Sequence, residues 1–345
     1  MSQEDRVEEI RRRAEELRNR VISLESRLNN VLDIALKLDE YSINLPLKLK
    51  DVRRRGYVFK KHLEEDLEKL TEQWMRFRHE YIAISNAIKG SHLPEIAAFK
   101  SKVDKVYYSV DPSSVDYFTS ELNFLESEFN RVEMRISQDI SRVEGMLSGL
   151  DRSFESINNE VNRIIRDLNL LQSASFNLSE GEHLVECYKA KLMMEEKLKG
   201  YIFLTDRRLL FEEHKEVPVK KVLFIAVKKK LVKNLIVNVP VSEITQVSEG
   251  RVGLFEWKGV YVNLRDGRQL IFDLKDAEIK SFISTINRII RGDIGQEKIS
   301  ISIAVTRPEV IKCPYCGAPV RRPIEAYSIT CEYCGSVIEL PRTEH

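Results

Sequence analysis

The 345-residue chain has few of the features that mark a membrane-spanning, secreted or disulfide-rich protein. No apolar run approaches the roughly 20 residues that a membrane-spanning helix needs. The N-terminus is acidic and charged, unlike a secretory signal. Only five cysteines occur, and four of them form two Cys-x-x-Cys pairs, which favours zinc in a reducing cytosol over disulfides. We expect a cytoplasmic protein whose contact with any membrane is peripheral.

The sequence also lacks the motifs that commonly mark an enzyme. It contains no glycine-rich phosphate loop, no His-Glu-x-x-His pair and no nucleophile elbow. Its six histidines form no close pair with cysteine or carboxylate at ligand spacing. We therefore predict that the protein is not an enzyme.

Neither sign of charge dominates the chain, whose formal net charge is +1. The distribution is uneven, because residues 176–292 contain 21 basic and 16 acidic residues, a net charge of +5. Charged residues make up 32% of the whole chain, which is typical of proteins with extended, solvated helices. The central part is thus the electropositive part.

The N-terminal half of the chain has the pattern of a helical arm. Apolar residues recur in strict steps of three and four, the spacing of a coiled coil. We expect the first helix to end at Pro46, the second to end near Gly90, and a short helix to span Pro94 to Tyr108. A last helix begins after residues 111–114 and spans ~90 Å. The first seam consists of Val7, Ile10, Ala14, Leu17, Val21, Leu24, Leu28, Val31, Ala35 and Leu38.

The heptads fit two kinds of assembly. They could join two chains in a dimeric rod, or the helices could bury one another within one chain, because both use the same seam. A membrane-bending bundle is a third possibility, suggested by the basic residues at 53–55 and 60–61, although such runs are usually solvated faces.

Residues 181–291 have the pattern of a small β-domain closed by a helix. Two apolar runs flank the turn in residues 204–211, Leu-Thr-Asp-Arg-Arg-Leu-Leu-Phe, and a second hairpin surrounds Asp266 and Gly267. That Asp-Gly pair suits a type I′ turn. We expect a first strand from Leu184 to Met193 that contains Cys187 as a small buried residue. The closing helix places Ile279, Phe282, Ile283, Ile286, Ile289 and Ile290 on one side.

This order of elements resembles the GRAM and pleckstrin-homology-like superfamily. The resemblance is based on Gly181-Glu182, the hairpin at 204–211, the Val-Pro-Val-Ser-Glu-Ile turn at 239–244, the Asp-Gly hairpin and the closing helix. It covers about a third of the chain. It implies a bent antiparallel sheet plugged at one end by the helix, with a tendency to bind lipids or proteins. A fold of this kind does not by itself identify a ligand.

Two lysine clusters make the candidate binding site of this domain. They flank the apolar run at 222–227, which we expect to be a strand, and the second cluster is expected to form a turn into a strand over 231–239. Lysines near an anionic surface could attract headgroups, whereas lysines on a sheet edge could instead prevent unwanted pairing. Arg207 and Arg208 are expected to be structural. The candidate residues are Lys220, Lys221, Lys228, Lys229, Lys230 and Lys233.

The C-terminal tail contains two Cys-x-x-Cys-Gly knuckles separated by 14 residues. Four thiolates at this spacing suit tetrahedral Zn²⁺, and four cysteines leave no open position, so we predict one structural zinc. The tail resembles the zinc ribbon family over about 30 residues. Zinc ribbons bind nucleic acids or proteins, and here Arg321, Arg322 and Tyr327 could make such contacts. The predicted ligands are Cys313, Cys316, Cys331 and Cys334.

Together these features predict a multidomain α+β protein. Residues 1–175 form the helical coiled-coil or bundle arm, 176–292 the GRAM/pleckstrin-homology-like domain, 293–309 a linker with a possible strand in its alternating isoleucine run, and 310–345 the zinc ribbon. We expect a non-enzymatic cytoplasmic scaffold that binds an anionic membrane or a protein and could form a homo-oligomer through the arm. The alternative is a nucleic-acid-associated factor that uses the ribbon as reader and the coil as dimeriser.

Overall fold

The chain forms two compact units, residues 1–299 and residues 300–345. The first contains a helical arm and a β-sheet domain, and the second contains two short hairpins. The possible strand of the linker is expected over the alternating run from Ile299 to Val305, and its residues 300–305 lie outside the described residues. The structure is a computed structural model that describes residues 2–222, 225–252, 257–299, 309–315, 319–322, 328–331 and 335–339.

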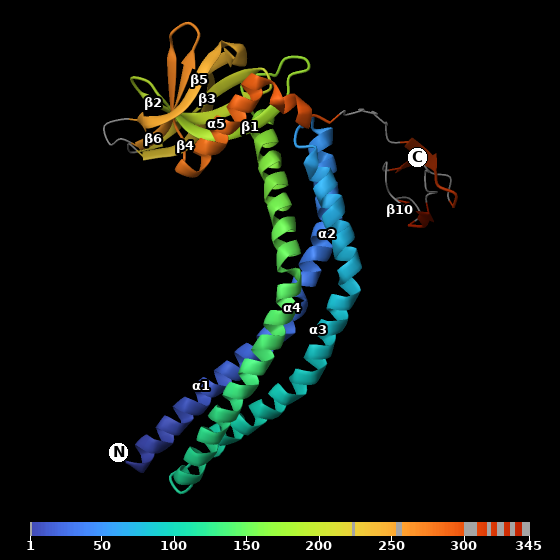
Figure 1. Cartoon of the computed structure of the whole chain (residues 1–345), viewed down its shortest axis with the longest axis vertical. Helices are drawn as coiled ribbons and strands as arrows, with labels where there is room; N and C mark the ends of the chain where they lie inside the picture. The colour runs from blue at the N-terminus through green and yellow to red at the C-terminus, as the bar shows by residue number, and fades with distance from the viewer. Residues whose placement is uncertain are drawn as a thin grey trace. The chain divides into compact units, whose positions relative to one another are not determined.

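Long helices form the arm of the first unit (Figure 1). Helix α1 (Gln3–Asn29) passes through a short 3-10 turn (Asn30–Leu32) into α2 (Asp33–Arg54), which ends near the sheet domain. Helix α3 (His62–Ser109) runs back along them, and α4 (Val115–Gln172) returns to the sheet. The 58 residues of α4 span ~87 Å at 1.5 Å per residue.

The heptad seam is buried inside a single chain. Every apolar position of the predicted first seam, from Val7 to Leu38, is buried. The corresponding stripe of α4 is buried too, except for the half-buried Leu150 and Leu171. In the half of the arm far from the sheet, α1, α3 and α4 share one apolar core. The helices thus bury one another, as the intrachain interpretation of the heptads expects.

Two predicted helix ends are wrong. Helix α2 continues through Pro46, and α3 continues through Gly90 and Pro94 up to Ser109. A proline inside a helix removes one backbone hydrogen bond and costs about 3 kcal/mol. Here Leu45 and Leu49, on either side of Pro46, are buried in the bundle, and this burial offsets the lost bond.

A seven-stranded antiparallel sheet follows the arm, with the order β4-β3-β2-β1-β7-β6-β5. The predicted first strand is confirmed with its bounds. The order, together with one helix after the last strand, is consistent with the pleckstrin-homology-like fold that the resemblance implies. The strands are β1 (Leu184–Met193), β2 (Lys197–Thr205), β3 (Arg208–Val222), β4 (Ile225–Pro240), β5 (Ile244–Val252), β6 (Trp257–Leu264) and β7 (Gln269–Asp273).

The second hairpin turn differs from the predicted type I′ turn. Gly267 has a φ of 88°, but Asp266 does not have a positive φ, whereas a type I′ turn needs both. The amide of Gly267 donates to the carbonyl of Leu264 at 3.1 Å, and the amide of Leu264 donates to the carbonyl of Arg268 at 2.8 Å. The chain therefore makes a longer loop in which the glycine alone occupies the left-handed region.

Helix α5 (Asp276–Arg291) packs on the sheet through Ile279, Phe282, Ile286 and Ile289. The predicted apolar side of this helix is confirmed with one correction, because Ile290 is 39% exposed. Gly292 ends the helix in the left-handed conformation, with a φ of 79°.

Buried polar contacts join the arm to the sheet. The Asp167 carboxylate near the end of α4 accepts a hydrogen bond from the Cys187 amide of β1 at 3.0 Å. Arg163, one turn earlier, forms an ion pair with Glu186 at 2.5 Å. The Tyr57 hydroxyl, from the loop between α2 and α3, donates to the Val185 carbonyl at 3.3 Å. Cys187 is buried, as expected from the sequence.

The second unit contains two antiparallel hairpins. Strand β8 (Glu309–Lys312) pairs with β9 (Pro319–Arg322), and β10 (Ser328–Thr330) pairs with β11 (Val337–Glu339). Each predicted Cys-x-x-Cys knuckle lies in the segment that connects the two strands of one hairpin.

The proline inside α2 provides a test of this fold. Pro46→Ala should raise the free energy of unfolding by about 1–3 kcal/mol, because alanine restores a helix amide and has a higher helix propensity. Urea unfolding followed by circular dichroism measures the change. A loss of stability would show instead that the bundle depends on the proline at this position.

Candidate anion-binding surface and metal centre

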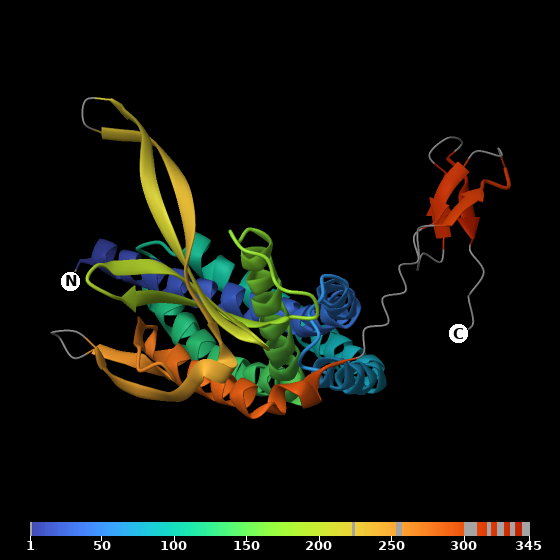
Figure 2. The same cartoon turned by 90° about the horizontal axis from the view of Figure 1, so that it is seen from above.

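Strands β3 and β4 extend beyond the sheet as a two-stranded ribbon (Figure 2). Strand β2 pairs with β3 only from Leu204↔Leu209 to Gly200↔Glu213. Beyond Glu213, the described partner of β3 is β4 alone, as far as Val222↔Ile225. Strand β3 is therefore paired with β4 alone over more than half of its length.

The pairing in the ribbon corrects the predicted strands. The apolar run at 222–227 is not one strand, because Val222 pairs with Ile225 across the end of the hairpin, and residues 223–224 lie outside the described residues. The lysines at 228–230 lie within β4 and do not form a turn. As a result the two predicted clusters meet, with Lys220 opposite Lys228.

The last predicted lysine lies at the base of the ribbon. The Lys233 ammonium group donates to the Ser173 hydroxyl at 2.8 Å and also to the Ser173 carbonyl. Ser173 immediately follows α4. Lys233 therefore attaches the ribbon to the end of the arm.

A second basic cluster, which the sequence analysis did not single out, surrounds a hollow of 430 Å³ on the sheet. Its lysines are Lys189 and Lys191 on β1, Lys199 on β2 and Lys275 at the start of α5. We call these four residues and their hollow the basic hollow. The hollow contains one carboxylate, Asp273, whose oxygen lies 2.7 Å from the Lys191 nitrogen.

The geometry of the hairpin brings these lysines together. Side chains two apart on a strand point to the same face, so Lys189 and Lys191 share a face of β1. Lys199 is the cross-strand partner of Lys191. Like charges directly opposite one another destabilise a sheet. The Lys-x-Lys spacing in both runs is the sequence signal that could have revealed this cluster.

Edge protection explains the basic hollow less well than it explains the ribbon lysines. Strands β1 and β2 are interior strands of the sheet, and Lys191 pairs with Lys199 on one side and with Asp273 of β7 on the other. Strand β4 is an edge strand, so that explanation still applies to the ribbon lysines. The basic hollow is thus the stronger candidate for an anion site.

The predicted structural arginines have structural partners. The Arg208 guanidinium donates two hydrogen bonds to the Glu182 carboxylate in a bidentate contact, with nitrogen–oxygen distances of 2.9 and 2.7 Å. The Thr205 hydroxyl donates to the same carboxylate at 2.6 Å and accepts from the Arg208 amide at 2.7 Å. The Arg207 guanidinium donates to the Glu180 carbonyl at 3.0 Å. These contacts hold the turn between β2 and β3 against the start of the domain.

The Glu182 contact makes stability depend on pH. Burial alone would raise the pKa of Glu182, but hydrogen bonds from Arg208 and Thr205 and the charge of Arg208 lower it from 4.5 to about 2. A carboxyl whose pKa is lowered by folding stabilises the protein above its unfolded pKa. That contribution is lost as the pH falls from 4.5 towards 2.

We therefore predict that Glu182→Gln removes part of the acid sensitivity of the domain. Wild-type protein should lose on the order of 2–3 kcal/mol of unfolding free energy from this group between pH 5 and pH 2. The variant should be less stable at pH 7 and should show a shallower decline over the same interval. Urea unfolding at a series of pH values measures both curves, and parallel curves would contradict the prediction.

The predicted metal ligands are only partly described. Cys313 follows β8 and Cys331 follows β10, and both are buried, whereas Cys316 and Cys334 lie outside the described residues. The Gly335 amide donates to the Cys331 carbonyl at 2.8 Å, and Gly335 has a φ of 71°. Among the residues that the structure describes, no group of three or more potential ligands could hold a metal ion.

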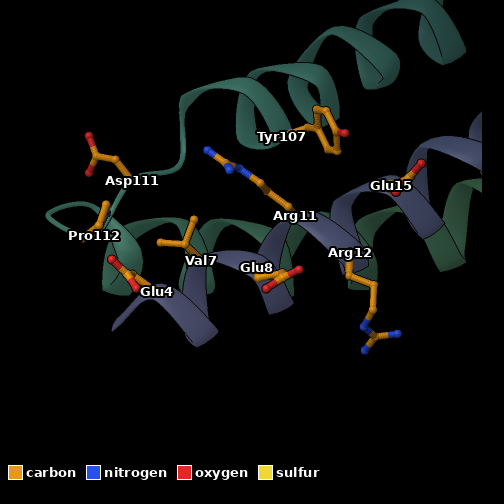
Figure 3. Close-up of a pocket in the computed structure, with 9 residues that line it drawn as sticks. All are labelled: Glu4, Val7, Glu8, Arg11, Arg12, Glu15, Tyr107, Asp111 and Pro112. Atoms are coloured by element: carbon orange, nitrogen blue, oxygen red, sulfur yellow. The ribbon is translucent and has the colours of Figure 1, made fainter. Parts of the chain in front are cut away.

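Another hollow lies at the far end of the arm (Figure 3). It has a volume of 650 Å³ and is lined by α1, the end of α3 and the loop after it. Figure 3 shows Glu4, Glu8 and Arg12 along α1, with Asp111 across from them. Both signs of charge line this hollow, so its electrostatics favour no single class of ligand.

Comparison with known protein families and with curated proteins finds no match. Among solved structures, the chain is similar to the PH domain of Slm1 in complex with phosphoserine, with 16% identity over 31% of this chain and 96% of that one and a TM-score of 0.22. The linker-DH/PH domains of p115-RhoGEF show 14% identity over 84% and 98% and a TM-score of 0.24. The C-terminal domain of an unknown protein from Leishmania infantum shows 15% identity over 32% and 87% and a TM-score of 0.24.

At these TM-scores the similarities carry no argument, so the fold assignment rests on the strand order and the closing helix. In the part of the chain that the structure describes, no helix is long and apolar enough to cross a membrane.

Proposed function

We propose that this protein is a non-enzymatic adaptor whose sheet domain binds an anionic membrane surface. The observation that carries the proposal is the basic hollow, in which four lysines and one aspartate line a concave surface on interior strands. An anionic headgroup in the hollow would relieve the repulsion between Lys191 and Lys199. The ribbon lysines would add a second, less specific contact.

The energy of such contacts bounds the expected affinity. Lysines near an anionic surface each contribute on the order of 1 kcal/mol, so four give roughly 4 kcal/mol. That corresponds to a dissociation constant of about 1 mM for the hollow alone. A single domain should therefore bind weakly and in a salt-dependent manner.

The more specific GRAM assignment is part of the same proposal. The contact between Glu182 and Arg208 supports it, because it joins two of the motifs on which the resemblance is based, Gly181-Glu182 and the hairpin at 204–211.

We predict that the full chain cosediments with vesicles of phosphatidylcholine and phosphatidylserine at low salt and dissociates as salt increases. Lys189→Glu with Lys199→Glu should lower the binding constant at least about thirtyfold, because two attractions of about 1 kcal/mol each are replaced by repulsions. Both side chains are exposed, so the double variant should fold.

The matched control is Lys69→Glu with Lys105→Glu, two exposed lysines of α3, which should bind as the wild type does. Equal binding to vesicles of phosphatidylcholine alone would contradict the proposal. Salt-dependent binding to a DNA or RNA duplex without binding to the vesicles would support the alternative of a nucleic-acid-associated factor.

We also propose that the second unit is a zinc ribbon that supplies another interaction surface. The residues present fit zinc, because Cys313 and Cys331 are buried at equivalent places in two hairpins, and the left-handed Gly335 lets the second knuckle turn tightly. Four thiolates would hold the ion as a structural centre. Such a small unit depends on its metal for folding.

The metal prediction is one zinc ion per chain. Elemental analysis of protein purified without chelator should find this ratio, and Cys316→Ser should reduce it to well below one. The loss should leave the unfolding transition of residues 1–299 unchanged, because they form a separate unit. Protein that folds normally and contains neither zinc nor iron would contradict the prediction.

A further inference from the structure

The outward face of helices α2 and α3 near the sheet domain has the character of an interface. A groove of 570 Å³ runs between these helices, lined by Pro46, Leu49 and Leu67 at its floor. The Thr71 hydroxyl in the groove is buried and has no hydrogen-bond partner among the described residues. We call this surface the α2/α3 face.

Large apolar side chains are exposed beside the groove. Leu36, Ile43 and Leu47 follow one another at helical spacing on α2 and are 64%, 64% and 58% exposed. Met75 is 63% exposed on α3 and lies one turn beyond Thr71. Exposed apolar residues that line up beside an apolar groove mark an interaction surface.

The two walls of the groove carry opposite charges. The α2 wall contributes Lys50 and Arg53, and the α3 wall contributes Glu64, Glu68 and Glu72. This separation matters for any symmetric contact of the face with itself, because a two-fold axis places each wall against a wall of the other copy.

The direction of the two-fold axis decides which walls meet. An axis perpendicular to the helices would bring α2 against α2 and α3 against α3, with like charges opposed. An axis parallel to the helices brings α2 of one copy against α3 of the other, with opposite charges facing. The charge pattern therefore selects the parallel axis.

The heights of the residues along the groove agree with this pairing. Arg53 forms an ion pair with Glu64, and Asp39 forms one with Arg78. Asp39 and Arg53 are 14 residues apart, as are Glu64 and Arg78. These two ion pairs set the register between the antiparallel helices α2 and α3. In this register, Lys50 of α2 lies level with the turn of α3 that contains Glu68. A parallel two-fold axis preserves height, so Lys50 of one copy faces Glu68 of the other.

We propose that the α2/α3 face binds a second copy of this chain, with a two-fold axis along the arm. Ile43 and Leu47 of each copy pack on the groove and on Met75 of the other, and Lys50 pairs with Glu68 twice. The heptad seam takes no part in this contact, because α3 and α4 cover it within each chain.

The parallel axis has a functional consequence, which rests on the proposed membrane role. Both sheet domains lie at the same end of the paired arms, so the dimer carries two basic hollows at that end. Two linked sites bind with an avidity well above that of either alone. The pairing itself does not depend on that role and is measured without membranes.

The test is the mass of the full chain in solution, measured by light scattering and sedimentation over a wide concentration range. Wild-type protein should form a dimer. Ile43→Glu with Leu47→Glu should give a folded monomer with an unchanged circular dichroism spectrum, because both residues are exposed. Phe124→Glu is the matched control, a 62% exposed apolar residue of α4 away from this face, and should remain dimeric.

Charge reversal tests the direction of the axis. Lys50→Glu or Glu68→Lys alone should weaken the dimer by about tenfold, because each places like charges in contact twice. The two changes together should restore it. A monomeric wild type, or a dimer that the Ile43 and Leu47 changes leave intact, would overturn the proposal. Failure of the paired reversal to restore the dimer would overturn the parallel axis.

Discussion

The buried carboxylates between α4 and the sheet are the constraint on which the arrangement of the first unit depends. Asp167 is 3% exposed, and burial raises its pKa, while the Cys187 amide and Arg166 act in the opposite direction. Glu186 is 5% exposed and accepts from Thr285 of α5 at 3.1 Å, in addition to its ion pair with Arg163. A buried carboxylate that loses its partners is costly, so these contacts hold α4, β1 and α5 in one geometry.

The loop between α2 and α3 provides a second connection at the same end of the arm. Tyr57 and Phe59 are buried there, and the Val58 carbonyl accepts a hydrogen bond from the Ile299 amide at 2.9 Å. Lys60 forms an ion pair with Glu160 of α4 at 2.7 Å. A membrane-bending bundle, the third possibility for the arm, would use the basic residues of this region to contact a surface. The structure instead places Arg53 in contact with Glu64 and Lys60 with Glu160, so both have structural partners.

Helices and strands whose buried residues recur at a regular spacing were predictable from the sequence. Features that depend on which strands pair with each other were not. The heptads, the strand at Leu184–Met193 and the closing helix each follow from one repeating pattern. Local propensity predicts helix ends at Pro46 and Gly90, whereas both helices continue; at Pro46 the burial of Leu45 and Leu49 outweighs propensity. The ribbon end and the basic hollow depend on which strands pair. Only the register shows that Lys220 meets Lys228 and that Lys191 meets Lys199.

The weak binding expected of one basic hollow and the proposed pairing of the arms can be understood together. A hollow of four lysines provides too little energy for stable attachment of one domain, as the estimate of roughly 4 kcal/mol shows. More lysines on interior strands would repel one another and destabilise the sheet. The proposed pairing of two arms would avoid this limit, because it would add a second site without adding charge to the first. The polar junction at Asp167 and Glu186 is what such an arrangement requires, since avidity is lost when linked sites cannot face the same surface.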